Sequence, residues 1–247
     1  MAREDRWWAD GRRFLLLACR VLWRELNYYS AQSPHELTIR YLEQGLHKTP
    51  DRLRAALQEQ IDAASDHDFD ALPLGYGLCS NGIVGLRPRS VPLVVPRAHD
   101  CITFLLGSKE RYREYFDQRP GTYWYTPGWI ECTEMPGPEH REKTYRAYCE
   151  KYGEENALYL MECMEDWYRK YNNVAYVDLG SVYTASFKQF ARRCAEGLGW
   201  NYDELRGDPA LVQRLVDGRW NEEDFLVVHP GQEIVADVNS PGVIRAK

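Results

Sequence analysis

Short, mostly apolar runs alternate with amphipathic segments along the first hundred residues. The apolar runs cover residues 14–19, 37–42, 69–74 and 91–95, and each has the length of a strand. Residues 20–29 have helical character, and Thr49-Pro50 supplies an N-cap and a first-turn proline for a helix with Leu53, Leu57 and Ile61 on one face. This alternation predicts a βαβ arrangement. Because the run 91–95 is wholly apolar, both faces of the predicted parallel sheet should be covered.

The same alternation continues through the rest of the chain. Helices are predicted at 102–106, 108–116, 139–171, 184–197 and 211–216, and strands at 174–179 and 225–229. Residues 119–138 are dense in aromatic residues, glycine and proline, which predicts an ordered loop or lid. We therefore expect an α/β fold with Rossmann-like, mostly parallel sheets flanked by helices. Its two α/β halves would be residues 1–118 and 139–247, joined by the loop 119–138.

Composition narrows the classes of protein that this chain can represent. The 247 residues are 44% hydrophobic and 28% charged, with a net charge of -6, which is typical of a globular protein. Lys and Arg form no long block, so we expect no nucleic acid partner. The longest apolar stretch near the N-terminus is six residues, whereas a membrane span needs about 20. We therefore expect a cytoplasmic protein without a membrane partner, whose seven cysteines are reduced thiols.

Three of these cysteines predict a site. Cys19, Cys79 and Cys101 each follow an apolar run, and the carboxyl ends of parallel strands share one edge of a sheet. Three thiolates close together repel one another unless a cation holds them. Zinc takes four Cys or His ligands, whereas a four-iron cluster can take three cysteines and leave one iron open, so we predict zinc or an iron–sulfur cluster without deciding between them. In the alternative interpretation, Cys19 and Cys79 are small buried hydrophobic residues.

Polar residues near these cysteines are candidates for the chemistry. His47 and His99 could be further ligands or acid/base groups, and Asp100 could orient His99 or share its catalytic role. Arg97 could hold an anionic substrate group, although it and Asp100 could equally form structural ion pairs, and His47 could be an exposed loop residue. A metal-free alternative has Cys101 as a nucleophile paired with a histidine.

The glycine-rich segment GYGLCSNGIVG carries Cys79. Its glycines do not match a dinucleotide-binding loop or a P-loop, so close packing of backbone around a ligand is the better interpretation, with Tyr76 as a substrate-binding residue. Further along, Tyr123, Trp124, Tyr125 and Trp129 could wall a pocket or cage a methylated ammonium group, or they could form an aromatic plug between the two halves. The remaining four cysteines are expected to be structural: Cys132, Cys149, Cys163 and Cys194.

Several long segments resemble the domain of unknown function 1638 family: LGYGLCSNGIVGL, PRAHDCITFLLGSKERYREYF, GTYWYTPGWIE and DGRWNEEDFLVVHPG. The resemblance extends from RFLLLACRVLWREL to the C-terminal HPG. Its pattern includes eight residues: Cys19, Glu25, His47, Cys79, Arg97, His99, Asp100 and Cys101. It implies an association with corrinoid-dependent methyltransferases in bacterial and archaeal one-carbon metabolism. His-x-Cys at 99–101 is also similar to the motif of zinc enzymes that activate a thiol for methyl transfer, where Cys132 would be the later cysteine.

These observations lead to a functional expectation. The protein is predicted to be a metal- or iron-sulfur-dependent enzyme, a transferase or lyase, that acts on a small molecule linked to one-carbon or corrinoid metabolism. Three strand-end cysteines with an open cluster position would resemble the arrangement in quinolinate synthase. The alternative is a non-catalytic accessory protein that binds a metal or cofactor and has a corrinoid protein or methyltransferase as its partner.

Overall fold

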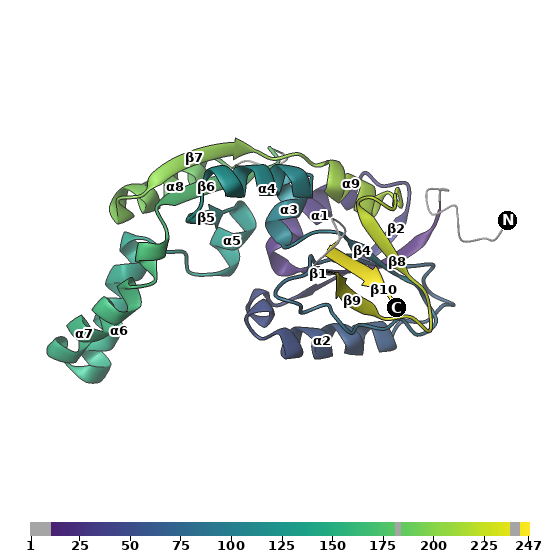
Figure 1. The fold of residues 1–247 in the computed structure, drawn as a ribbon, viewed down its shortest axis with the longest axis horizontal. Helices are drawn as coiled ribbons and strands as arrows, with labels where there is room; N and C mark the ends of the chain where they lie inside the picture. Colours follow the sequence, from purple (N-terminus) through teal and green to yellow (C-terminus); the bar gives the residue numbers. More distant parts are fainter. Residues whose placement is uncertain (1–10, 181–183, 238–242) are drawn as a thin grey trace. The chain divides into compact units, whose positions relative to one another are not determined.

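The chain folds into two compact units. The computed structural model describes residues 11–180, 184–237 and 243–247 (Figure 1). Unit 1 comprises the chain up to Tyr112 together with Asp208–Lys247, and unit 2 comprises Arg113–Gly207. Both units contain mostly parallel strands flanked by helices, so the predicted α/β class is confirmed. The unit boundaries differ from the predicted ones because a strand near the C-terminus joins the N-terminal sheet.

Unit 1 is built on a five-stranded sheet. Its order is β2 (Glu36–Leu42), β1 (Arg13–Cys19), β3 (Leu72–Gly75), β4 (Leu93–Pro96) and β8 (Phe225–Val228). The first four strands are parallel, and β8 runs antiparallel to β4 with Leu93 opposite Val228. Every residue of β1 after Arg13 is buried, as expected for a strand with neighbours on both sides and layers on both faces.

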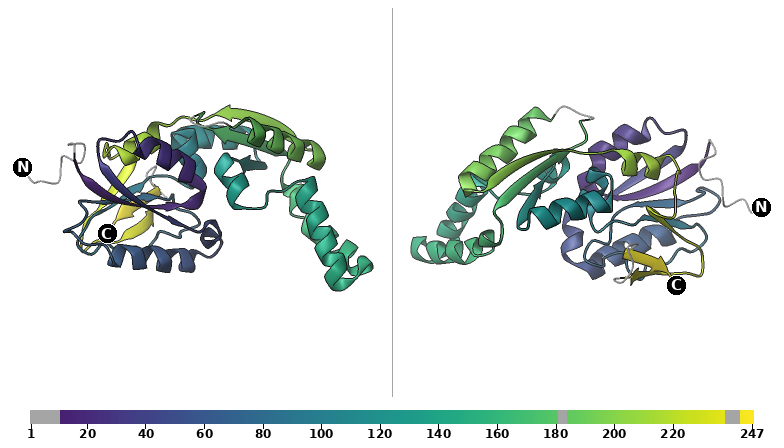
Figure 2. Two further views of the ribbon diagram at one scale, coloured as in Figure 1. Left: turned by 180° about the vertical axis from the view of Figure 1, so that it is seen from behind. Right: turned by 45° about the horizontal axis from the view of Figure 1, so that its top comes forward.

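Helices cover the two faces of this sheet (Figures 1 and 2). The helix α2 (Pro50–Asp62) lies on one face and buries Leu53, Leu57 and Ile61, as its periodicity predicts. The antiparallel pair β9 (Ile234–Asp237) and β10 (Val243–Ala246) lies on the same side. The opposite face carries α1 (Trp23–Ser30), α3 (Cys101–Leu106) and α9 (Ala210–Val216), which pack on one another. Two short 3-10 helices complete the connections: η2 (Arg20–Leu22) and η3 (Gln44–Lys48).

Unit 2 contains a three-stranded parallel sheet in the order β5 (Thr122–Tyr125), β6 (Asn173–Asp178) and β7 (Asn201–Arg206). Val174 and Tyr176 on β6 pack against Ala191 and Cys194 of α8 (Ala185–Leu198) in its core. The other helical elements described in this part of the chain are α5 (Pro127–Cys132), α6 (Pro138–Tyr152), α7 (Glu154–Glu165) and η4 (Tyr168–Lys170). The helix α4 (Lys109–Gln118) continues from unit 1 into unit 2.

Two predictions about local structure were wrong, and three strands were missed. Residues 119–138 were predicted to be an ordered loop or lid, but they contain regular elements, because the aromatic segment forms β5 and a capped proline turn begins α5. The predicted helix at 139–171 is interrupted at Gly153, whose φ of 83° ends α6 and permits a second helix to begin. The strands β7, β9 and β10 were not predicted.

Across the described residues, no helix is both long enough and apolar enough to cross a bilayer.

Candidate functional site

The topology of unit 1 defines where a ligand site is expected. From β1 the chain passes through α1 to β2 on one side, and then through α2 to β3 on the other side of β1. In open α/β sheets, ligands bind at such a switch point, outside the carboxyl ends of the strands. Cys19 is the last residue of β1, and Tyr76 directly follows β3. The sequence therefore places a thiol and a phenol at the switch point.

The loop after β3 is held close to the loop after β4 by backbone contacts. The backbone N–H groups of Leu78 and Cys79 donate to the carbonyl oxygens of Ala98 and His99 over 2.8 and 3.0 Å. Gly77 makes this approach possible, because a Cβ atom there would lie 2.7 Å from the backbone nitrogen of Asp100. The two loops therefore act as one structural element.

A left-handed turn carries Cys79. The φ angles of Cys79, Ser80 and Asn81 are 46°, 56° and 66°, although none of the three residues is glycine. Each such conformation costs about 1–3 kcal/mol and tends to occur at functional sites. The turn is closed by the backbone N–H of Gly82, which donates to the carbonyl of Cys79 over 3.0 Å. The chain thus maintains a strained backbone at the position of this thiol.

Asp100 positions the third cysteine. Its carboxylate caps α3 by accepting hydrogen bonds from the backbone N–H groups of Ile102 and Thr103, at 3.0 and 3.3 Å. The other carboxylate oxygen accepts from the hydroxyl of Tyr112 over 3.1 Å. Cys101 is therefore held at the first position of α3, where it is buried. The sequence analysis missed Tyr112, because nothing in the chain marks its 12-residue separation from Asp100 as a contact.

The three cysteines share Tyr76 as a neighbour. The Tyr76 side chain is 1% exposed, and no nitrogen or oxygen atom of the described residues is placed to hydrogen-bond its hydroxyl. Burial raises the pKa of Tyr76, the nearby Cys19, Cys79 and Cys101 raise it further, and so does a side-chain hydrogen bond with Cys19. Thiols separated by up to 82 residues thus meet around one buried phenol.

The electrostatics of this group disfavour free thiolates. Burial raises the pKa of the Cys79 thiol to about 12, and the neighbouring Asp100 and Cys19 contribute to the rise. Burial also raises the pKa of Asp100, although hydrogen bonds from the Thr103 and Ile102 backbone and from Tyr112 oppose that effect. At neutral pH the Cys79 thiol is therefore protonated unless a cation binds beside it.

The predicted histidines occupy different surroundings. His99 is exposed, precedes the α3 cap and stacks on Tyr112 with ring centroids 6.2 Å apart. His47 lies in η3, after the carboxyl end of β2, and its Nδ1 contacts the Gln44 carbonyl. Their roles as ligands or acid/base groups stay predictions.

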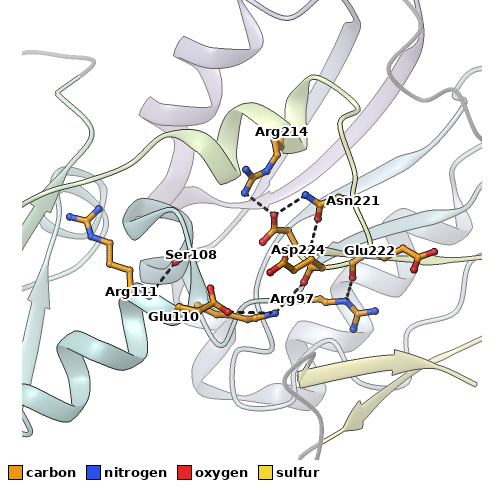
Figure 3. A network of polar contacts seen from close by, with 10 residues as sticks. Arg97, Ser108, Glu110, Arg111, Arg214, Asn221, Glu222 and Asp224 are labelled. Carbon is orange, nitrogen blue, oxygen red and sulfur yellow. Dashed lines mark hydrogen bonds and ion pairs between the residues drawn. The ribbon is translucent and has the colours of Figure 1, made fainter.

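Arg97 directly follows β4, and its guanidinium faces backbone carbonyls (Figure 3). It donates to the carbonyl oxygens of Glu222 and Ile244, and its backbone N–H donates to Asp224. Asp224 is itself paired with Arg214 at 2.8 Å. These contacts give Arg97 a structural role in joining β4 to the chain before β8, whereas its contact with a substrate stays a prediction.

Glu25 is a buried carboxylate on α1, only 2% exposed. Burial raises the pKa of Tyr41, and the nearby Glu25 raises it further.

Within the described part of the chain, no three His, Cys, Asp or Glu side chains are arranged to hold a metal ion. The three thiols lie near Tyr76 but are not arranged as the ligands of one metal ion.

The aromatic segment of unit 2 forms a packed cluster. Tyr123 contacts Trp167, Tyr171 and Trp200 with ring centroids 6.0, 5.2 and 6.4 Å apart. Rings that touch one another in this way fill the space that a caged ammonium group would need. This geometry favours an aromatic core within unit 2 over a cage, whereas a plug between the two halves stays a prediction. Among the cysteines expected to be structural, Cys194 is buried in the unit 2 core, whereas Cys163 is exposed.

The geometry of unit 1 defines a doubly wound α/β protein with three cysteines near Tyr76 at its switch point. The family model described as "Protein of unknown function (DUF1638)" matches residues 41–216, well over half of the chain. The chain belongs to the DUF1638 family. No curated protein and no solved structure matches it.

Proposed function

We propose that Cys19, Cys79 and Cys101 bind a transition-metal ion or an iron–sulfur cluster, and that the protein uses this centre as an enzyme. The observation that carries the proposal is the proximity of three thiols to the buried Tyr76 hydroxyl at the switch point. Thiolates are the preferred ligands of zinc, Cu(I) and iron–sulfur clusters. A positive ion would also supply the charge that a Cys79 thiol with a pKa of about 12 needs to ionise.

The donor set fits such a centre in its chemistry, and ligation requires the thiols to turn toward a common point. The Cys79 turn and the first residue of α3 would supply two ligands, and the end of β1 would supply the third. When bound, the centre would supply an electrophilic position for a substrate or thiol acceptor. The exposed imidazole of His99, stacked on Tyr112, would carry protons at the surface of the site.

We further propose a small molecule of one-carbon or corrinoid metabolism as the substrate. This part rests on the family resemblance and on the position of the site, since switch points of open sheets bind small ligands. Transfer of a group to or from a metal-bound thiolate and elimination at an open cluster iron are the two reaction classes that this donor set supports.

Anaerobic purification tests the proposal through elemental analysis and absorption spectroscopy. We expect about one zinc, or about four irons with a brown colour, per chain. Replacing Cys19, Cys79 or Cys101 by Ser should lower the metal content several-fold, whereas Cys163→Ser, at an exposed cysteine of unit 2, should leave it unchanged. Wild-type protein that stays metal-free after anaerobic reconstitution would refute the proposal, and so would equal metal content in all variants.

The same preparation distinguishes an enzyme from an accessory protein. An enzyme keeps an open position, so an added small ligand such as cyanide should shift the absorption spectrum of an iron centre or of a cobalt-substituted zinc site. An unchanged spectrum would indicate a closed site, which favours the carrier role over catalysis.

A further inference from the structure

The helical hairpin of unit 2 carries the most exposed apolar side chains described in this protein. The large hydrophobic residues exposed over 40% are Tyr28, Phe116, Tyr152, Leu158 and Tyr159, and the last three belong to the hairpin. Leu158 and Tyr159 are the most exposed of all, at 56% and 67%. Such a concentration marks an interaction surface, whereas scattered single residues do not.

The hairpin consists of α6 and α7, which pack on each other on either side of Gly153. Figures 1 and 2 show it extending from the sheet of unit 2. Its base is fixed to α8, because Gly197 lacks a Cβ atom where the Pro138 ring packs. None of the residues of α6 is buried, and on α7 the buried ones include Ala157 and Met161. Two helices with so little shared core have a face available for further packing.

This available face is a shallow groove. It has a volume of about 400 Å³ and is lined by Tyr148, Tyr152, Asn156, Tyr159 and Leu160. Tyr148 and Tyr152 are four residues apart on α6, and Asn156 and Tyr159 are three residues apart on α7, so each pair lies on one side of its helix. The groove therefore follows both helices of the hairpin.

The charges on α6 and α7 indicate what binds in this groove. The helix α6 has four Lys and Arg residues and three glutamates, whereas α7 has four glutamates and no Lys or Arg. No ion pair links Glu155 or Glu162 to any residue that the structure describes. Packing α7 on another α7 would bring glutamates together, but packing it on α6 of a second copy would pair opposite charges.

We propose that this groove is a homodimer interface, in which two hairpins related by a two-fold axis form a four-helix bundle. Each α7 lies on α6 of the other copy, and the tyrosines of both grooves form the shared core. An isologous interface repeats the same contact twice, so the complementarity of α6 and α7 within one chain serves both halves. The bundle supplies the apolar packing that the isolated hairpin lacks.

Sedimentation equilibrium of the full chain tests the dimer. We expect a mass of twice 28.9 kDa at micromolar concentrations. Tyr159→Asp places a charge in the centre of the apolar interface and should raise the dissociation constant at least about tenfold. Tyr28→Asp is the matched control, because Tyr28 is an exposed tyrosine of unit 1 and its replacement should leave the mass unchanged. Circular dichroism checks that both variants fold.

A charge exchange tests the orientation of the helices. The pair Glu155→Lys with Glu162→Lys removes the net negative charge of α7, and the pair Arg141→Glu with Lys151→Glu makes α6 acidic. Each protein alone should dimerise at least about tenfold more weakly than the wild type, and an equimolar mixture should recover part of that loss as a heterodimer. A wild-type chain that stays monomeric would overturn the proposal and leave the groove to a different protein. A dimer unaffected by Tyr159→Asp would overturn it as well.

Discussion

Replacement of Gly77 by alanine tests whether the two loops of the site act as one element. The added Cβ would lie 2.7 Å from the Asp100 nitrogen and 2.8 Å from the Ala98 oxygen, both backbone atoms. Because ordinary contacts are about 3.5 Å or longer, the loops must separate by about 0.7 Å. That movement stretches the hydrogen bonds from Leu78 and Cys79, which measure 2.8 and 3.0 Å. Overpacking costs about 1–3 kcal/mol and each of the two weakened bonds about 1 kcal/mol, so we expect a loss of about 3–5 kcal/mol.

Urea unfolding measures this loss directly, and Gly45→Ala is the control. A Cβ at Gly45 meets no atom within 4 Å, so that variant should be as stable as the wild type or gain up to about 1 kcal/mol. Metal content gives a second readout, because Gly77 lies between Tyr76 and Cys79. A Gly77→Ala protein with wild-type stability would show that the close approach is unimportant. Lost stability with retained metal would separate the loop contact from the site.

Two further perturbations have defined outcomes. Asp100→Ala removes the acceptor for Ile102, Thr103 and Tyr112 and should lower the free energy of unfolding by about 1–3 kcal/mol. Asp100→Asn keeps the capping oxygen, so its free energy of unfolding should fall by less. Equal losses of the two variants in urea unfolding would contradict the role of Asp100 as a cap. Burial raises the pKa of Cys194 to about 11 from 9.0, so its protonated form contributes stability that is complete below pH 9 and is lost as the pH rises to 11. The stability advantage of the wild type over Cys194→Ala should therefore shrink by up to about 3 kcal/mol in that window, and a constant difference in thermal unfolding would refute the assignment.

The sheet of unit 1 could be predicted because its central strands are buried on both faces. A wholly apolar run such as β4 identifies a covered strand without help from distant residues. The strand β7 was missed for the opposite reason, since it lies at an edge and none of its residues is buried, so its sequence NYDELR has no apolar run. Gly153 was overlooked inside a long helical pattern, where a single glycine is tolerated unless it adopts a positive φ.

The sequence could predict which residues of the candidate site lie together, because the order of the strands determines this, but not the detailed geometry of the site. Parallel strands bring Cys19, Tyr76 and the Cys101 helix to one edge wherever they occur in the chain, so the meeting of distant residues could be anticipated. The role of Asp100 as the cap of α3 could also have been inferred, since an aspartate directly before an apolar helix is a typical N-cap. The left-handed turn at Cys79 could not be inferred, because no residue in Cys-Ser-Asn requires a positive φ. The tertiary contacts of the loop impose this conformation.

Two unfavourable features occur together at the switch point, and their coincidence argues for a ligand. A buried hydroxyl whose hydrogen-bond partner is only the weak thiol of Cys19 costs up to about 1–3 kcal/mol, and the left-handed residues beside it cost about as much each. Stability alone would favour phenylalanine at Tyr76 and glycine in the turn. Neither feature is needed to close the sheet, because the hydrogen bonds of Leu78 and Cys79 already join the loops. A bound cation would offset both costs, since it would give the thiols and the phenol oxygen a common partner.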